Sequence, residues 1–336
     1  MKNLILFIAL CLLFACKKED EPSSGKYNDG IFVLNEGNFG TGNGSISYWN
    51  RENKSSTTDI FSIENGGALV GNILQSMTVS GDRRYLVVNN SNKIVVTDLN
   101  FKFINEIKGF ELPRYIKIIG DQAFVTQWGA DGISGSLKIV DLSSSTITNT
   151  IALGKGPENI LLRNSKLYIG STGGYDVDNK MWIINPTSLT IEKTLTLSDN
   201  PSIFAELDGH LYILCKGYYN FNNPANSTDG ALVRLKDDEI DQSYPIGGQA
   251  ERLVAADNAL YLTNYGSLNK FTAAGGISSL SLNKLFYGLG VDTKTGKIVG
   301  LDAKNYASSG QAYIIDGTSI IDSFTTGIIP TEVYTE

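Results

Sequence analysis

Side chains that usually carry nucleophilic, acid–base or metal chemistry are scarce in this sequence. It has one histidine, His210, which follows Asp208-Gly209 in a turn between two apolar segments. A Ser-His-Asp or Cys-His arrangement therefore lacks a well-placed base, and a multi-histidine metal site is impossible. Cys215 lies inside an apolar segment and is interpreted as a small buried hydrophobic residue. We predict no catalytic residues, no resident metal and no cofactor.

One metal alternative stays open. Asp176, Asp178 and Asn179 lie together in the loop Tyr175–Lys180 and could ligate calcium through oxygen atoms. Turn chemistry explains the same residues equally well.

The chemistry expected of Cys16 is covalent lipidation. The apolar run Leu4 to Ala15 is too short to cross a bilayer about 30 Å thick and has the length of a secretory-signal core. Leu13-Phe14-Ala15-Cys16 resembles a bacterial lipobox, in which the cysteine is lipidated and becomes the new N-terminus. The run Lys17–Glu21 resembles the signal that places Bacteroidota lipoproteins on the outer face of the outer membrane; a solvated linker is the alternative. We predict a signal peptide over 1–15, a lipidated tether over 16–29, and exposure at the cell surface.

The bulk composition is that of a globular protein. The chain has 336 residues, of which 42% are hydrophobic and 19% charged. A net charge of -7 gives a nucleic-acid partner no electrostatic basis. Because Cys11 lies in the signal and Cys16 is expected to carry lipid, Cys215 has no disulfide partner within the mature chain.

The segments that must position any site have sequence patterns typical of short β-strands. Past residue 29, runs rich in Ile, Val, Leu, Thr and Tyr alternate with Gly, Asn, Asp and Ser clusters. Groups of four runs open at Pro113, Pro157 and Pro201, a constant step of 44 residues. A fixed period near this length that holds four strands is typical of a β-propeller blade.

The two chain ends complete the count of blades. Looser groups open at Leu74–Ser80, Gln249–Leu253 and Phe286–Leu289. The first group has three runs, which are Ile31–Asn35, Ser45–Asn50 and Thr57–Ile63, and its missing inner strand is Pro330–Tyr334. We therefore predict an all-β fold, a single seven-bladed propeller over residues 30–336 closed by pairing of the C-terminal strand with the N-terminal blade. Closure removes exposed edge strands; rings of six or eight blades are the alternatives.

The loops after the second strand of each blade are expected on one face, around the central channel. Six of these seven loops hold an aromatic residue, usually beside Gly and Asn. Loop aromatics without partners expose apolar area, so we interpret them as the rim of a ligand-binding bowl; packing between blades is the alternative. The candidate ligand-binding residues here are Asn35, Glu36, Asn38, Phe39, Asn89, Trp128, Tyr175, Tyr218, Tyr219, Tyr265 and Tyr306.

The first residues of each inner strand are expected to face the channel mouth. These polar side chains can contact a ligand or satisfy one another across the ring. They are Gln75, Arg114, Tyr115, Glu158, Asn159, Ser202, Glu251, Arg252, Tyr287, Thr331 and Glu332.

The lipobox-like start, the opening Val33-Leu34-Asn35-Glu36-Gly37-Asn38-Phe39 and the irregular blades together resemble a known family. The chain is similar to surface-exposed propeller lipoproteins of Bacteroidota, of the DUF5074 type and related to periplasmic YncE-like proteins with YVTN-type repeats. Some members of that group capture cobalamin and pass it to a TonB-dependent outer-membrane transporter. The resemblance implies non-enzymatic capture of a small molecule, with a corrinoid as one candidate ligand and such a transporter as partner. It assigns no ligand residue, so the candidates above rest on their expected place in the fold.

Two other functions stay open at this point. The same face could serve a protein-interaction or adhesion module. A propeller lyase or dehydrogenase is the other, with a Tyr or Glu as the base.

Overall fold

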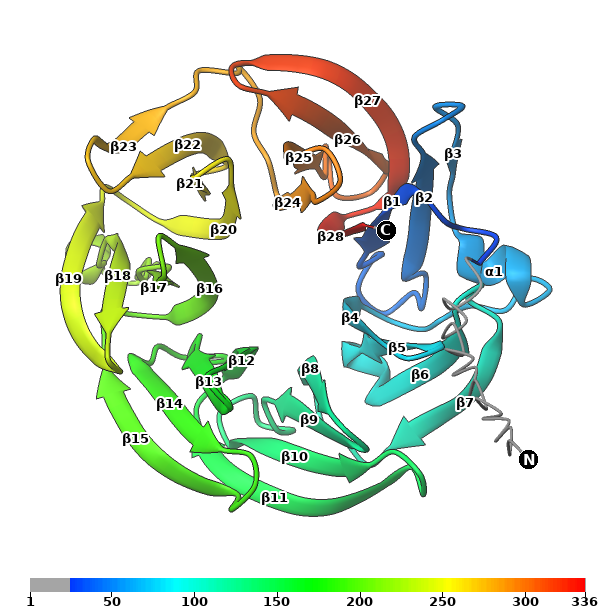
Figure 1. Ribbon diagram of the computed structural model, residues 1–336, viewed down its shortest axis with the longest axis horizontal. Coiled ribbons are helices and arrows are strands. Elements are labelled where there is room, and N and C mark those ends of the chain that lie inside the picture. Colours follow the sequence, from blue (N-terminus) through cyan, green and yellow to red (C-terminus); the bar gives the residue numbers. More distant parts are fainter. Residues whose placement is uncertain (1–24, 336) are drawn as a thin grey trace, which may run out of the picture.

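Seven four-stranded antiparallel sheets stand around a central axis in the computed structural model, which describes residues 25–335 (Figure 1). The predicted seven-bladed all-β propeller is confirmed. The predicted signal peptide and lipidated Cys16 lie outside the described residues. None of the helices within the described range has the length and apolar character needed to span a bilayer.

Each blade runs from an inner to an outer strand. Blade 1 contains β28 (Pro330–Thr335), β1 (Gly30–Asn35), β2 (Ser45–Asn50) and β3 (Ser56–Thr57). Blade 2 contains β4 (Leu74–Ser80), β5 (Arg83–Val88), β6 (Lys93–Asp98) and β7 (Phe103–Lys108). Blade 3 contains β8 (Pro113–Ile119), β9 (Gln122–Gln127), β10 (Gly135–Asp141) and β11 (Thr146–Gly154).

The later blades repeat this order. Blade 4 contains β12 (Pro157–Arg163), β13 (Lys166–Ser171), β14 (Lys180–Asn185) and β15 (Thr190–Thr196). Blade 5 contains β16 (Pro201–Leu207), β17 (His210–Cys215), β18 (Gly230–Lys236) and β19 (Glu239–Ile246). Blade 6 contains β20 (Ala250–Ala256), β21 (Ala259–Asn264), β22 (Ser267–Thr272) and β23 (Gly276–Ser279). Blade 7 contains β24 (Gly288–Asp292), β25 (Lys297–Asp302), β26 (Ser309–Asp316) and β27 (Ser319–Ile328). Between residues 25 and 335, three short helices lie in connections: α1 (Ile60–Glu64), η1 (Asn89–Ser91) and η2 (Pro224–Asn226).

The ring closes where β28 pairs antiparallel with β1, from Ile31 opposite Thr335 to Leu34 opposite Glu332. Strand β1 is buried on both faces because successive side chains point to opposite sides of the sheet. Ile31 and Val33 pack toward blade 7, whereas Phe32 and Leu34 pack toward blade 2. The predicted pairing of the two chain ends is confirmed.

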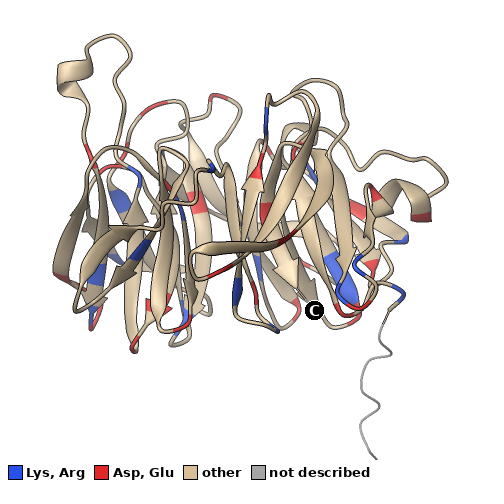
Figure 2. Cartoon of the chain, turned by 90° about the horizontal axis from the view of Figure 1, so that it is seen from above, with Lys and Arg blue, Asp and Glu red and all other residues tan. Residues whose placement is uncertain are grey.

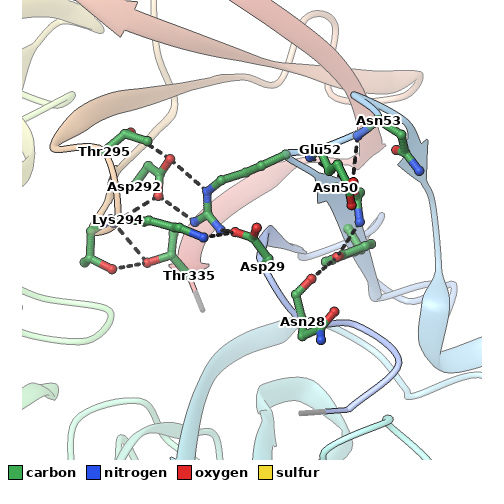
Figure 3. A network of polar contacts seen from close by, with 12 residues as sticks. Asn28, Asp29, Asn50, Glu52, Asn53, Asp292, Lys294, Thr295 and Thr335 are labelled. Carbon is green, nitrogen blue, oxygen red and sulfur yellow. Dashed lines mark hydrogen bonds and ion pairs between the residues drawn. The ribbon is translucent and has the colours of Figure 1, made fainter.

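A polar cluster reinforces this closure at the ends of β2 and β24 (Figure 3). The Arg51 guanidinium donates to both oxygens of Asp292, at 2.6 and 3.1 Å, and at 2.8 Å to Asp29, which also accepts from Lys294. The Arg51 and Asp292 side chains are only 10% and 3% exposed. Burial alone would raise the pKa of Asp292, but hydrogen bonds from Arg51 and Thr295 outweigh it and hold the pKa below its usual value.

The prediction of a strand over Thr57–Ile63 is wrong. Strand β3 ends at Thr57, and Ile60–Glu64 forms helix α1. The Asp59 carboxylate accepts from the Ser62 amide as an N-cap, which satisfies one of the free N–H groups that begin a helix. Helical backbone also lets Ile60 and Phe61 reach the cluster between blades 1 and 2, where both are buried.

The closure cluster gives a stability prediction. Arg51→Met leaves the Asp292 carboxylate buried without its cation, so it should lower the free energy of unfolding by about 3–5 kcal/mol in chemical denaturation. Lys54→Gln, which breaks the exposed pair with Asp322, is the control and should change it by less than about 1 kcal/mol. The difference in free energy of unfolding between the wild type and Arg51→Met should shrink as pH falls through the folded-state pKa of Asp292, because protonation of Asp292 removes the ion pair. Equal effects of the two variants would contradict a role in closure.

Candidate ligand-binding face

The loops after the second strands and the connections between blades share one face of the ring, here called the mouth face. Backbone hydrogen bonds join the two sets: Trp128 N donates to Leu112 O at 3.1 Å, Tyr265 N to Gln249 O at 3.2 Å, and Phe286 N to Gly266 O at 2.8 Å. In an edge-on view the longest loops project from one face and are mostly uncharged (Figure 2). The expected grouping of these loops is therefore what the structure has.

A β-bulge lies near the start of six of the seven inner strands, where the pairing with the second strand shifts register. Only β24 pairs with β25 in unbroken register. A bulge re-aims side chains beside the extra residue, which is why bulges recur at functional rims. In this protein the bulges lie at the mouth-face end of the channel. They are formed by consecutive residues such as Arg114-Tyr115, Glu158-Asn159 and Glu251-Arg252.

One half of the mouth is a closed polar network, which we call the linked half. Arg114 donates to both oxygens of Glu158 at 2.9 and 2.7 Å and to Gln75 Oε1 at 2.6 Å. Trp128 Nε1 donates to Glu158 at 3.0 Å, and the Arg114 guanidinium lies 4.2 Å from the Trp128 ring centre. Burial would raise the pKa of Glu158, but the charge of Arg114 and its hydrogen bonds hold it below the usual value. These residues satisfy one another, so here the mutual-satisfaction interpretation holds.

The other half of the mouth, the open half, has cations without partners. Within residues 25–335, the side chains of Arg252 and Lys216 have no hydrogen bond or ion pair, and Arg252 Nε is fully buried. The Arg252 guanidinium lies 5.5 Å from the Tyr287 ring centre. Burial, followed by the positive charge of Arg252, lowers the pKa of Lys216 to about 8.

Two carboxylates face the same open half. Tyr287 OH donates to Glu36 at 3.4 Å, and Tyr115 OH donates to Glu332 at 3.1 Å. Burial raises the pKa of both carboxyls, although Arg252 pulls in the opposite direction. Charged groups of both signs thus face one space without pairing directly.

A pocket of about 330 Å³ opens beside this half, between blades 6 and 7. Its aromatic walls are Tyr265, Tyr287 and Tyr306, and the last two rings meet edge to face at 5.4 Å. Tyr265 and Tyr306 are 59% and 51% exposed. Three tyrosines that were candidates from sequence therefore line one pocket.

The backbone at this pocket is strained. Tyr265 and Tyr306 have φ angles of 47° and 60°, in the left-handed region that bulky residues rarely occupy. Tyr265 is the first residue of a two-residue turn between β21 and β22, where Asn or Gly is preferred. Bulky residues elsewhere in the ring, such as Phe101 and Leu112, have the same backbone conformation, so the strain accompanies the pocket and does not by itself mark a ligand site.

The remaining candidates divide into structural and exposed residues. Asn35 and Asn89 are buried and donate to Ser47 and to the Pro113 carbonyl, so they hold the fold. Asn38 donates to the Tyr306 carbonyl and links two rim loops. Phe39 and Tyr219 are exposed rim residues, Tyr218 and Asn159 are partly buried, and Tyr175 packs edge to face on Trp128 at 5.9 Å.

Sequence reasoning missed Lys216 as a site residue. The signal was available, because Lys216 is the first residue after a second strand, the position that Glu36 and Trp128 hold in their blades. Its charge gave no sign that it would be partly buried. His210 begins β17, at the opposite end from Lys216, and is far from the mouth.

The calcium alternative has little support from the loop Tyr175–Lys180. The Asp176 carboxylate pairs with Lys155, and Asp178 accepts from Ser171. Across the described range, no group of three or more His, Cys, Asp or Glu side chains is placed to hold a metal ion.

The two halves of the mouth should respond differently to loss of an arginine. Arg114→Met strands the buried Glu158 carboxylate and should reduce the free energy of unfolding by about 3–5 kcal/mol. Arg252→Met removes a guanidinium that no side chain pairs, so the loss should be about 1 kcal/mol or less. Urea denaturation of both variants measures this, and a larger loss for Arg252→Met would refute the division into halves.

Comparisons with known proteins agree with the fold. No curated protein matches the sequence. A quinonprotein alcohol dehydrogenase-like protein from Bacteroides thetaiotaomicron is 15% identical, with 92% of this chain and 78% of that chain covered and a TM-score of 0.67. The periplasmic gluconolactonase PpgL of Pseudomonas aeruginosa is 10% identical, with coverage of 91% and 98% and a TM-score of 0.66. A putative 6-phosphogluconolactonase from Bacteroides fragilis is 13% identical, with coverage of 94% and 99% and a TM-score of 0.65.

Identities this low establish a shared propeller fold and carry no activity over to this chain. The expected lipid anchor and the likeness to YncE remain predictions. The family is settled by residues 29–331, which match the family described as Domain of unknown function (DUF5074). The chain therefore belongs to the DUF5074 family, with the architecture of a seven-bladed β-propeller.

Proposed function

We propose that this protein is a non-enzymatic binding protein that captures a small molecule on its mouth face. The observation that carries the proposal is the open half of the mouth. There the buried Nε of Arg252 has no hydrogen-bond partner within residues 25–335, and the guanidinium lies 5.5 Å from the ring centre of Tyr287, which lines the pocket with Tyr265 and Tyr306. Buried polar groups without partners are rare in folded proteins, and a ligand is one way to satisfy them. The pocket volume of 330 Å³ lies at the lower end of the range for small-molecule sites.

The chemistry of the open half favours a ligand with a flat or sugar-like part and polar arms. Tyrosine faces bind the flat part by stacking, and the hydroxyls of Tyr265 and Tyr306 can form hydrogen bonds with the polar arms. A corrinoid, the ligand class implied by the family resemblance, has a broad ring and amide arms that both donate and accept. It is larger than the pocket, so one edge would enter and the rest would lie across the mouth. A siderophore or a glycan has related features and belongs in the same test.

We also propose delivery to a TonB-dependent outer-membrane transporter by a protein anchored through Cys16. Large apolar side chains are exposed around the mouth, with Phe221 87% and Phe39 78% exposed. Their loops are rich in Tyr, Asn, Gly and Ser, a composition that antibody loops use to contact proteins. A rim of this kind would let a partner cover the mouth and its ligand.

The tyrosine pocket is tested by binding and stability together. Tyr265→Asn and Tyr306→Asn place a residue that tolerates the left-handed backbone, so melting temperature should stay level or rise. Affinity should fall by about 1–3 kcal/mol at each position that contacts the ligand. The measurement is calorimetry of the delipidated domain with cobalamin, cobinamide, haem and a siderophore panel.

Trp128→Ala is the matched control because Trp128 belongs to the linked half. It should lower the melting temperature through loss of its contacts with Arg114 and Glu158, and it should leave affinity nearly unchanged. If no compound gives a heat of binding and a pulldown retains only a protein, the proposal of small-molecule capture is wrong and the protein-interaction function is favoured.

The rim predicts a separable partner contact. Phe221→Ser combined with Phe39→Ser should weaken binding to the TonB-dependent outer-membrane transporter proposed as partner, because both rings lose apolar contact area. Ligand affinity should stay at the wild-type level, since neither ring lines the tyrosine pocket. Surface plasmon resonance with the purified transporter in detergent measures the first quantity, and unchanged transporter binding would rule out this docking surface.

A further inference from the structure

We propose that Arg252 and Lys216 form an oxyanion subsite, which holds a carboxylate or phosphate group of the captured ligand at the channel mouth. This inference rests on the proposed binding function and names the chemical group that the open half recognises. It does not depend on which larger molecule carries that group.

Arg252 supplies the first cation of the proposed subsite. Its Nε is buried and makes no hydrogen bond, although a guanidinium has five N–H donors in a planar fork. The side chain is fixed from one side by the Tyr287 ring, 5.5 Å from the guanidinium carbon. A planar fork held in place with a free edge matches the two oxygens of a carboxylate or phosphate.

Lys216 supplies a second cation, from blade 5 next to the blade of Arg252. It follows β17 directly, and its backbone is fixed because its N–H donates to Asn200 O at 3.0 Å and its carbonyl accepts from Ala250 N at 3.0 Å. Its ammonium has no ion pair within residues 25–335. Burial and the charges of Arg252 and Arg114 make the charged form of Lys216 unfavourable, which lowers its pKa to about 8. A bound anion near Lys216 would reverse that effect.

The carboxylates that face these cations do not take the anion's place. Glu158 is already paired with Arg114 at 2.7 Å. Glu36 and Glu332 each accept from a tyrosine hydroxyl and lie beyond ion-pair distance of Arg252. Glu251, the neighbour of Arg252 in sequence, acts on Lys216 through its charge alone.

These surroundings link anion binding to pH. Lys216 must be protonated to attract the anion, and burial raises the pKa of Glu36 and Glu332, so a bound anion would favour their neutral forms. Both effects strengthen binding as pH falls. Between pH 7 and pH 9, loss of the Lys216 proton alone should weaken binding by about tenfold.

The test uses sulfate, whose charge is constant over this range, and succinate as the carboxylate probe. Calorimetry of the delipidated domain at constant ionic strength should detect at least one of them at pH 7, and binding should be about tenfold weaker at pH 9. Arg252→Gln and Lys216→Met should each weaken binding more than tenfold. Lys216→Arg should retain binding at pH 9, because its charge does not titrate there.

Lys155→Met is the control, since Lys155 lies on the mouth face but already pairs with Asp176. It should bind both anions as the wild type does. Equal loss in Lys155→Met, or no loss in Arg252→Gln and Lys216→Met, would show an adventitious ion only and overturn the subsite. If neither anion binds or competes while the ligand panel still binds through the tyrosines, the oxyanion subsite is wrong and the capture function stands.

Discussion

The pairing of β28 with β1 is the interaction on which the rest of this structure depends. It joins the last described residues to the first strand, and blades 7 and 2 pack on its two faces. Tyr334 extends the contact, because its hydroxyl accepts from the Met77 amide in blade 2 at 2.8 Å. A propeller without this pairing would expose two unpaired strand edges. It would also separate Glu332 from Tyr115 and Arg252, so the mouth exists only in the closed ring.

Within the ring, the mouth shows how one architecture can serve stability in one place and binding in another. In the linked half, Arg114, Glu158 and Trp128 satisfy one another and join blades 3 and 4. In the open half, Arg252 and Lys216 have no ion pair within residues 25–335, and the pocket tyrosines Tyr265 and Tyr306 have strained left-handed backbones. Unpaired charge and strain both reduce stability, and proteins retain such features where function requires them. Buried hydrophobic clusters lie between each pair of neighbouring blades and supply the stability that offsets this loss.

Much of the fold could be predicted because its signals are local. The 44-residue step between Pro113, Pro157 and Pro201 and the alternation of apolar runs gave nearly correct strand limits. The error at Thr57–Ile63 has a physical cause: Ile60, Phe61 and Ile63 read equally well as a strand or as a helical turn. The Asp59 cap and the packing of Ile60 and Phe61 in the hydrophobic cluster between blades 1 and 2 favour the helix. The bulges at the inner strands were also missed, since a bulge depends on the partner strand.

The sequence by itself determined the all-β class, the number of blades, the closing strand and the set of loops that meet at the mouth. These follow from periodicity and turn residues, which act over a few neighbours along the chain. Only the tertiary structure decided which rim residues pair and which stay free. Arg114 and Arg252 both lie at the bulge of their inner strand, Arg114 as its first residue and Arg252 as its second; Glu158 pairs with Arg114, whereas no carboxylate within residues 25–335 pairs with Arg252. That difference depends on distances of a few ångströms between blades far apart in sequence, because ion pairs and hydrogen bonds form only at short range.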